Sequence, residues 1–232
     1  MSNLNSSKPK AGFMLINKPV GPTSHDIIDH LRQITGIKKI GHAGTLDPMA
    51  DGLLLVAIGR EATKKINQFV KLDKKYQATL FLGAVSDTYD REGRIKTIWP
   101  DNKPKPSLAE IKKAVQSFVG RGEQIPPMFS AKKIGGQKLY QLARAGQTVK
   151  RQPIKIEIYS LKIISYRWPH LTIAVHCSSG TYIRTLAHDL GQRLNCGAYL
   201  TSLTRTAIGP FRLKQAVTIN ELKKGDWQNF LF

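Results

Sequence analysis

The chain has 232 residues, 41% of them hydrophobic, which is enough for a packed core in one large domain or two small ones. Lys and Arg number 36 against 16 Asp and Glu, so a formal net charge of +20 favours a polyanionic partner, most often nucleic acid, over charge that serves solubility alone. Two cysteines, Cys177 and Cys196, exclude a disulfide scaffold, and the lack of a CxxC pair argues against zinc.

The N-terminal segment MSNLNSSKPKAG is polar and lacks the apolar core of a signal peptide. No apolar run approaches the roughly 20 residues needed to span a bilayer. We therefore predict a flexible tail over residues 1–12 and a soluble, cytoplasmic protein with no membrane partner.

The first predicted elements are a strand in GFMLINKP and a helix in TSHDIIDHLRQITG. The helix has apolar residues on one face, Thr23 or Ser24 as its N-cap and Gly36 as its stop. The polar loop GHAGTLDPMADG (residues 41–52) follows.

After this loop, LLLVAIG reads as a buried strand. EATKKINQFVKL predicts a single amphipathic helix, and KKYQATLFLG alternates as a strand does, with Tyr76 on its apolar side. The inward positions of that helix are Ala62, Ile66, Phe69 and Val70.

The stretch DREGRIKTIWPDNKPKPS is rich in turn residues and is predicted to be a connection without regular elements. The helix in SLAEIKKAVQSFVG has the capping-box spacing at Ser107 and Glu110, and Gly120 suits its far end. From Ala131 to Lys155 the chain carries seven basic residues and no acid.

Two strands, in IKIEIYSLKIISY and HLTIAVHCS, precede a helix in GTYIRTLAHDLGQRL and an extended segment or strand pair in AYLTSLTRTAIGPF. Helices and strands alternate without regular βαβ spacing. We therefore predict an α+β fold with a mixed, largely antiparallel sheet, flanking helices and a basic insertion over about residues 124–155.

The loop over residues 41–52 contains the strongest candidate for chemistry. Its glycines let the backbone bend, and Pro48 pushes Asp47 toward an extended conformation. A carboxylate held in a fixed direction suits a nucleophile or a general base. The alternative is a turn in which Asp47 only caps backbone amides.

The segment from Gly41 to Lys64 strongly resembles the signature of the TruB family of tRNA pseudouridine synthases. Four further segments resemble that family's blocks in the expected order, so the resemblance covers nearly the whole chain. They are GFMLINKPVGPTSHD, KKYQATLFLG, QIPPMFSAKKIGGQKLYQLARAG and HCSSGTYIRTLAHDLG.

The resemblance implies a pseudouridine synthase fold and the isomerisation of uridine at position 55, in the T-loop of tRNA, to pseudouridine. It implies that Asp47 is the nucleophile, attacking either the ribose or the uracil ring, and that no metal or organic cofactor is needed. It also implies a stand-alone bacterial type, with the T-arm of tRNA as partner and no obligatory protein partner.

Two more catalytic residues are expected. Tyr76 would stack on the extruded base and relay a proton through its hydroxyl, or else be an ordinary core tyrosine. The guanidinium of Arg184 would pair with Asp47 and stabilise its charged form, or else bind phosphate.

The resemblance also implies four substrate-binding residues. His42 would fill the space that the flipped uridine leaves, while Tyr182 and Leu203 would line the uracil pocket. Lys18 would orient the loop or bind a phosphate. Alternatively, these residues are ordinary loop and core positions.

The basic insertion is expected to close over the RNA as a mobile finger, made flexible by Gly135 and Gly136, and to offset the cost of extruding the base. The alternative is a solvated charged loop. After the catalytic blocks we predict no complete C-terminal PUA domain. The candidate RNA-binding residues are Lys132, Lys133, Lys138, Arg144, Lys150 and Arg151.

Two polar clusters are predicted to be structural. DTYDREG has Tyr89 where a calcium loop needs an acid or amide, and His176 and Cys177 point to opposite faces of a strand. The functional alternatives are a non-catalytic RNA-binding or tRNA-folding protein on the same scaffold and, less favoured, an RNA-cleaving enzyme.

Overall fold

The computed structural model describes residues 11–100, 102–130 and 132–232, so the predicted tail lies almost entirely outside the described residues. The chain divides into two compact units. The first contains the residues up to Leu72 together with Arg205–Phe232, and the second is Asp73–Thr204.

The first unit is built around β3 (Asp51–Ile58), which pairs antiparallel with β1 (Gly12–Lys18) and β2 (Ile40–His42). The end of β12 (Ala198–Ile208) belongs to this unit and pairs with β13 (Phe211–Arg212). Every residue of β3 after Asp51 is buried, which explains its continuous apolar run.

Helix α1 (Ser24–Thr35) confirms the predicted capping signals of the first helix. Thr23 and Asp26 form a capping box, and Gly36 closes the helix with φ 71°. Because both ends are satisfied locally, the sequence sufficed to place them. The apolar face of α1 packs in one cluster with β1, β3 and α7 (Ile219–Lys224).

The single helix predicted after β3 is wrong. The chain forms α2 (Arg60–Lys65) and α3 (Asn67–Val70), separated at Ile66. Ile66 and Phe69 pack on the face of the sheet opposite α1. The Phe69 ring lies there 4.6 Å from that of Phe13. Val70, predicted to face inward, is 39% exposed.

The second unit contains a sheet in the order β12-β4-β11-β10-β7. The β4–β11, β11–β10 and β10–β7 pairs are antiparallel, which confirms the predicted α+β class. Helix α4 (Leu108–Gln116) packs on β10, and α6 (Ile183–Arg193) packs on β4 and α4. The bounds of the four strands are β4 Lys74–Leu82, β11 His170–Cys177, β10 Ile154–Arg167 and β7 Gly120–Gln124.

Two boundaries in this unit differ from the prediction. The stretch predicted to be a plain connection contains β6 (Ile95–Thr97), which pairs with β5 (Ala84–Ser86). Helix α4 starts at its predicted cap but ends at Gln116, and Gly120 instead opens β7 with φ 108°. The pairing of β7 with β10 joins segments that are remote in sequence, which local signals do not reveal. The β5–β6 pair is local, but the turn residues around it did not indicate a strand.

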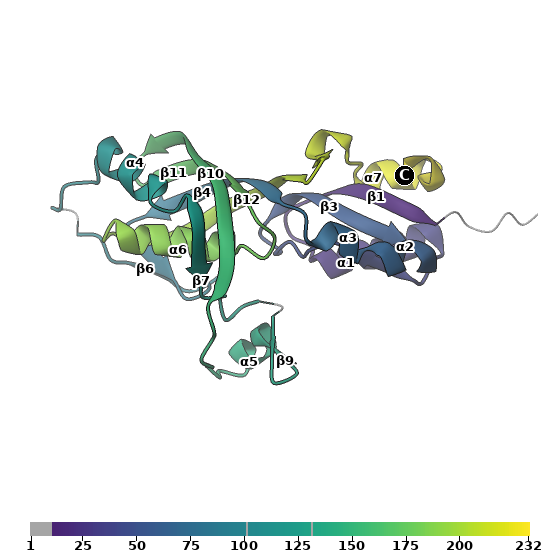
Figure 1. Cartoon of the computed structure of the whole chain (residues 1–232), viewed down its shortest axis with the longest axis horizontal. Helices are drawn as coiled ribbons and strands as arrows, with labels where there is room; N and C mark the ends of the chain where they lie inside the picture. The colour runs from purple at the N-terminus through teal and green to yellow at the C-terminus, as the bar shows by residue number, and fades with distance from the viewer. Residues whose placement is uncertain (1–10, 101, 131) are drawn as a thin grey trace, which may run out of the picture. The chain divides into compact units, whose positions relative to one another are not determined.

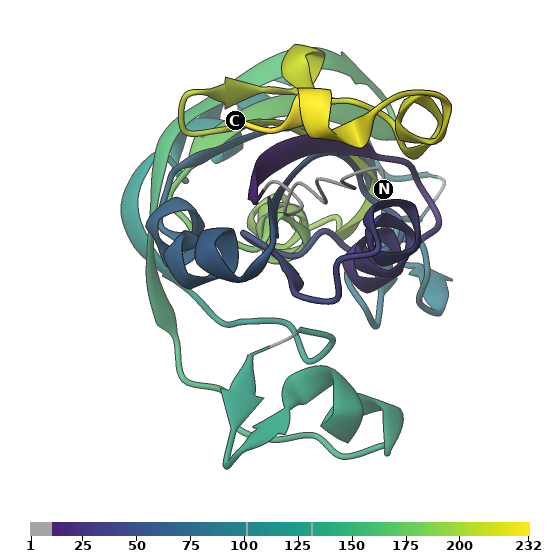
Figure 2. The same ribbon diagram turned by 90° about the vertical axis from the view of Figure 1, so that its right-hand side faces the viewer.

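The insertion between β7 and β10 forms a small hairpin and a helix that project from the sheet of their unit (Figures 1 and 2). The hairpin is β8 (Lys133–Ile134) and β9 (Gln137–Lys138), followed by α5 (Leu139–Arg144). Gly135 and Gly136 have φ 57° and 85°, as the two central residues of a tight hairpin require.

Two short 3₁₀ turns, Leu213–Gln215 and Trp227–Phe230, complete the described elements. Over the part of the chain that the structure describes, every helix is too short or too polar to cross a membrane.

Candidate active site

Apolar side chains within the loop over residues 41–52 hold it against the core of the first unit. Ala43, Leu46, Met49 and Ala50 are all at most 3% exposed, whereas Asp47 between them is only half-buried. The loop is therefore polar in composition but anchored by its own apolar residues, and this arrangement leaves the carboxylate of Asp47 partly open to solvent.

Two buried cations bind the backbone of this loop. Lys18, fully buried, donates from Nζ to the carbonyl of Ala50 (2.6 Å) and to that of Pro19 (2.8 Å). Arg205, 1% exposed, donates to the carbonyl oxygens of Leu53 (2.7 Å), Gly44 (3.0 Å) and Thr45 (3.4 Å). Lys18 was predicted either to orient the loop or to bind a phosphate. These contacts favour the first of the two roles.

Close backbone packing adds to this restraint. Gly52 has φ 101°, and a Cβ there would lie 2.5 Å from the carbonyl oxygen of Arg205, so only glycine fits. On the other side, the Ser24 hydroxyl accepts from the amide of Leu46 (2.8 Å), and the amide of Gly21 donates to the carbonyl of Pro48 (2.9 Å). Asp47 therefore lies on a segment tied to three different elements.

His42 leads into the loop from the end of β2. Burial lowers its pKa below the ordinary 6.5, and the positive charge of Arg205 lowers it further. A neutral imidazole is thus favoured in the folded protein near neutral pH. This polar, flat ring at the loop suits the predicted role of occupying the space of a flipped base.

The lowered pKa of His42 predicts that stability declines in mild acid. Below pH 6.5 the unfolded state takes up a proton that the folded state resists, so the free energy of unfolding falls as pH drops toward the folded-state pKa. His42→Asn removes this proton linkage. Denaturant titrations at pH 8 and 5.5 should therefore show wild type losing more stability than the variant, and parallel losses would contradict the prediction.

Arg205 is predicted to be essential for the order of the loop. Arg205→Met leaves three carbonyls without their donor, so we expect the free energy of unfolding to fall by about 2–4 kcal/mol. Arg212→Met is the matched control because that half-buried arginine also donates to carbonyls, of Gly209 and Phe211, outside the loop. Urea titration measures both, and equal losses would contradict a special role for Arg205.

In the second unit, Arg184 occupies the first turn of α6 and is only 4% exposed. Its guanidinium lies 3.4 Å from the carboxylate of Asp90 and donates to the carbonyls of Thr88 (3.1 Å) and Phe129 (2.6 Å). Asp90 is also buried, and its other oxygen accepts from the Thr88 hydroxyl (2.6 Å).

The segment DTYDREG therefore does more than form a turn. Tyr89 has φ 66°, unusual for a bulky residue, and its ring stacks on that of His188, with centroids 4.0 Å apart. Hydrogen bonds from the amides of Leu200 and Arg91 tie this segment to β12. These contacts give the segment a structural role, and sequence reasoning missed that Asp90 is an ionic partner of Arg184.

The other predicted residues of this unit lie near the base of the insertion or on the sheet. Tyr76, on β4, is half-buried on the same face as the buried Leu80, as predicted. Tyr182 precedes α6, and its backbone exchanges two hydrogen bonds with the buried side chain of Gln124, 2.9 and 3.1 Å long. Leu203 is 7% exposed on β12.

Gln124 ends β7 and thus joins the insertion to the start of α6. Nothing in its local sequence pointed to this role, because its partner Tyr182 is remote in the chain. Thr185 and Arg184 also contact carbonyls of this connection, those of Ile125 (3.5 Å) and Phe129 (2.6 Å).

The candidate RNA-binding residues differ in their surroundings. Arg144 and Lys150 are exposed, and Arg144 lies over the Tyr140 ring, 5.6 Å from its centroid. Arg151 is half-buried and donates to the carbonyl of Pro126 (2.9 Å), so it also anchors the insertion. Lys132 is half-buried, and the side chains of Lys133 and Lys138 lie outside the described atoms.

Lys18, His42 and Asp47 thus belong to the first unit, and the remaining predicted site residues to the second. The pairing of Asp47 with Arg184 stays a prediction.

Burial raises the pKa of the Cys177 thiol to about 11, which favours an unreactive core residue. Within the described residues, no three His, Cys, Asp or Glu side chains gather closely enough to hold a metal ion.

Comparison with known proteins assigns the chain to a family. Residues 32–183 match the model of the TruB family pseudouridylate synthase N-terminal domain, and residues 184–229 match that of the tRNA pseudouridylate synthase B C-terminal domain. A structural likeness to a chain in the crystal structure of a Cbf5-Nop10-Gar1 complex has a TM-score of 0.72 at 27% identity. It covers 92% of this chain and 54% of that one, about half its length.

Curated relatives agree with the family models. The tRNA pseudouridine synthase B of Protochlamydia amoebophila is 48% identical over 91% of this chain and 79% of its own length. The protein of the same name from Geobacter sulfurreducens is 47% identical over 92% of this chain and 69% of its own. Because one family model alone covers more than half of the chain, the chain belongs to the TruB family of pseudouridylate synthases.

Proposed function

We propose that this protein isomerises uridine at position 55, in the T-loop of tRNA, to pseudouridine, with Asp47 as the nucleophile. The observation that carries the proposal is the loop geometry: a half-buried aspartate on a backbone bound by two buried cations, Lys18 and Arg205. A merely structural turn has no need of so many restraints around a partly accessible carboxylate. The names of the relatives support tRNA as the substrate.

The target base is stacked inside a folded loop, so the enzyme extrudes it at a cost of a few kcal/mol. Contacts between RNA phosphates and the exposed cations of the insertion, such as Arg144 and Lys150, offset this cost by releasing counterions. His42 occupies the vacated space as a neutral ring.

In the reaction, the carboxylate of Asp47 forms a bond to the nucleotide, at either the ribose or the uracil ring, and the bond between N1 of uracil and C1′ of the ribose breaks. The base turns within the pocket, a new bond joins C5 to C1′, and the bond to Asp47 breaks, which restores the free carboxylate. The proton on C5 is then lost while N1 gains one, so the product is an isomer of the substrate and no cofactor is consumed. Tyr76 stacks on the base and relays the proton through its hydroxyl.

Arg184 is proposed to neutralise the Asp47 carboxylate during this sequence. Arg184 contacts the carboxylate of Asp90 and the carbonyls of Thr88 and Phe129, and the Thr88 hydroxyl in turn binds Asp90. These contacts support the proposal because they hold the guanidinium in a fixed direction. A rigid donor stabilises developing charge without reorganising during the reaction.

The decisive experiment incubates the protein with an unmodified T-arm transcript and maps pseudouridine chemically. Product at position 55 is expected. Binding of the transcript without product would favour the non-catalytic alternative, and product at another uridine would overturn the assigned position.

A further inference from the structure

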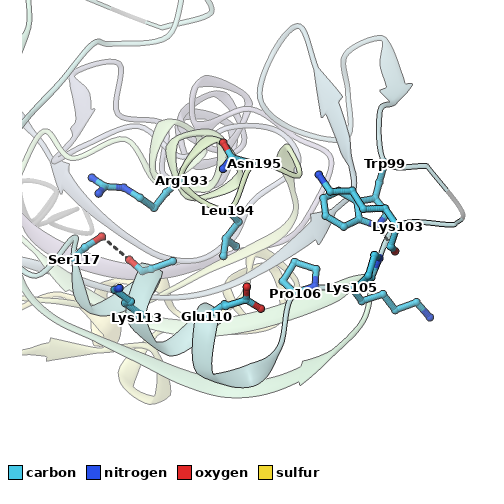
Figure 3. Close-up of a pocket in the computed structure, with 12 residues that line it drawn as sticks. Trp99, Lys103, Lys105, Pro106, Glu110, Lys113, Ser117, Arg193, Leu194 and Asn195 are labelled. Carbon is cyan, nitrogen blue, oxygen red and sulfur yellow. Dashed lines mark hydrogen bonds between the residues drawn. The ribbon is translucent and has the colours of Figure 1, made fainter.

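A basic pocket lies in the unit Asp73–Thr204, between the turn that precedes α4, the helix α4 and the end of α6 (Figure 3). Its volume of about 610 Å³ is in the range of small-ligand sites. Arg184 and Arg193 stand nine residues apart on α6, which separates the pocket from Arg184 by about 14 Å along the helix.

Cations dominate the lining of this pocket. Lys103, Lys105, Lys113 and Arg193 contribute to it, and Glu110 is the one carboxylate among the described lining residues. The carboxylate of Glu110 is already engaged, because it accepts from the amide and the hydroxyl of Ser107, both at 2.7 Å, in the cap of α4. The pocket therefore presents an unbalanced positive charge to a ligand.

An aromatic platform stands at one end of the pocket. The indole of Trp99 donates to the carbonyl of Lys103 (3.3 Å), and the Lys103 ammonium lies 4.1 Å over the ring (Figure 3). Trp168 supports the ring, with centroids 5.4 Å apart, and Pro104 and Pro106 add flat apolar surface. A ring fixed at its edge beside a displaceable ammonium suits the stacking of a planar base.

The walls of the pocket are held from outside. The Tyr166 hydroxyl donates to the carbonyl of Pro106 (2.5 Å), and the guanidinium of Arg193 lies 5.9 Å from the centre of the Phe118 ring. In Figure 3, Arg193 and Lys113 stand at the opposite end from Trp99 and Lys103. This arrangement suits a ligand with a base at one end and phosphates at the other.

We propose that this pocket binds an unpaired nucleotide of RNA, with its base on Trp99 and neighbouring phosphates on Lys113 and Arg193. The choice of RNA rests on the proposed function. The site would hold a part of the substrate RNA outside the isolated T-arm, so that it contributes to affinity for the larger RNA and not to the chemical step.

The test measures the binding of a labelled five-nucleotide oligouridylate by fluorescence anisotropy. The pocket variant Lys103→Ala/Arg193→Ala is compared with Lys96→Ala/Lys162→Ala, which removes the same charge from exposed positions of the same unit. We expect the pocket variant to bind at least about tenfold more weakly and with a shallower salt dependence, and the control to bind as wild type does. Equal affinities of the two variants would overturn the site.

An abasic oligonucleotide of the same length tests the platform. Wild type is expected to bind it several-fold more weakly than oligouridylate, whereas Trp99→Leu should bind both alike. A preference that survives in Trp99→Leu would overturn the stacking role.

Uridine monophosphate and inorganic phosphate serve as competitors that distinguish a site for a free nucleotide from a site for an RNA strand. Displacement of the oligonucleotide by either competitor, at concentrations near that of the oligonucleotide, would overturn the assignment to RNA.

Conversion of the T-arm transcript by the same preparations separates this proposal from the proposed function. The pocket variant is expected to convert the T-arm as wild type does while losing affinity for the oligonucleotide. Parallel loss of both would mean that the pocket belongs to the catalytic path, contrary to the proposal. Wild type that binds the oligonucleotide at the pocket but forms no pseudouridine would refute the proposed function alone.

Discussion

Asp47→Asn is expected to abolish pseudouridine formation while RNA binding stays nearly unchanged. The amide has the shape of the carboxylate but cannot act as a nucleophile, so the rate of product formation should fall by a factor of about 1,000 or more. Single-turnover conversion of the T-arm transcript measures the loss, and filter binding measures the affinity for the same RNA.

Asp51→Asn provides the matched control for this prediction. Asp51 is the second carboxylate of the same loop, half-buried at the start of β3. Its conversion to the amide should leave the rate within about tenfold of wild type. If Asp51→Asn inactivates the enzyme and Asp47→Asn does not, the assignment of the nucleophile is wrong.

Asp90→Ala is expected to reduce both stability and activity. It leaves the Arg184 guanidinium, 4% exposed, without the carboxylate that lies 3.4 Å away. Removing one partner of a buried ion pair lowers the free energy of unfolding by about 3–5 kcal/mol. Activity should also fall at temperatures where the variant is folded, because Arg184 loses a contact that orients it.

The control for Asp90 lies in the same segment. Asp87 forms an exposed ion pair with Arg94 (2.9 Å), so Asp87→Ala should cost no more than about 1 kcal/mol. The losses of Asp90→Ala and Arg184→Met should not add in the double variant, because both substitutions remove the same buried ion pair. Chemical denaturation of wild type, Asp90→Ala, Arg184→Met and the double variant measures this coupling, and strictly additive losses would exclude it.

Local signals in the sequence determined the elements whose ends are satisfied by near neighbours. The capping box of α4 at Ser107 was predicted, and the N-cap of α1 was narrowed to Thr23 or Ser24, because capping partners lie within four residues in the chain. The alternation along β4 likewise predicted which side chains face inward. The same kind of signal was insufficient after β3, where packing of Phe69 on Phe13 accompanies a break in the predicted helix.

The sequence blocks also determined the family and pointed to Asp47, because the types of residue around the loop and their spacing can be read directly from the sequence. Only the tertiary structure decided how that loop is held. Arg205 reaches Gly44, and Asp90 reaches Arg184, across long stretches of chain. A buried charge must find its partners wherever the fold provides them, and residue order alone does not encode which distant carbonyl or carboxylate will be there.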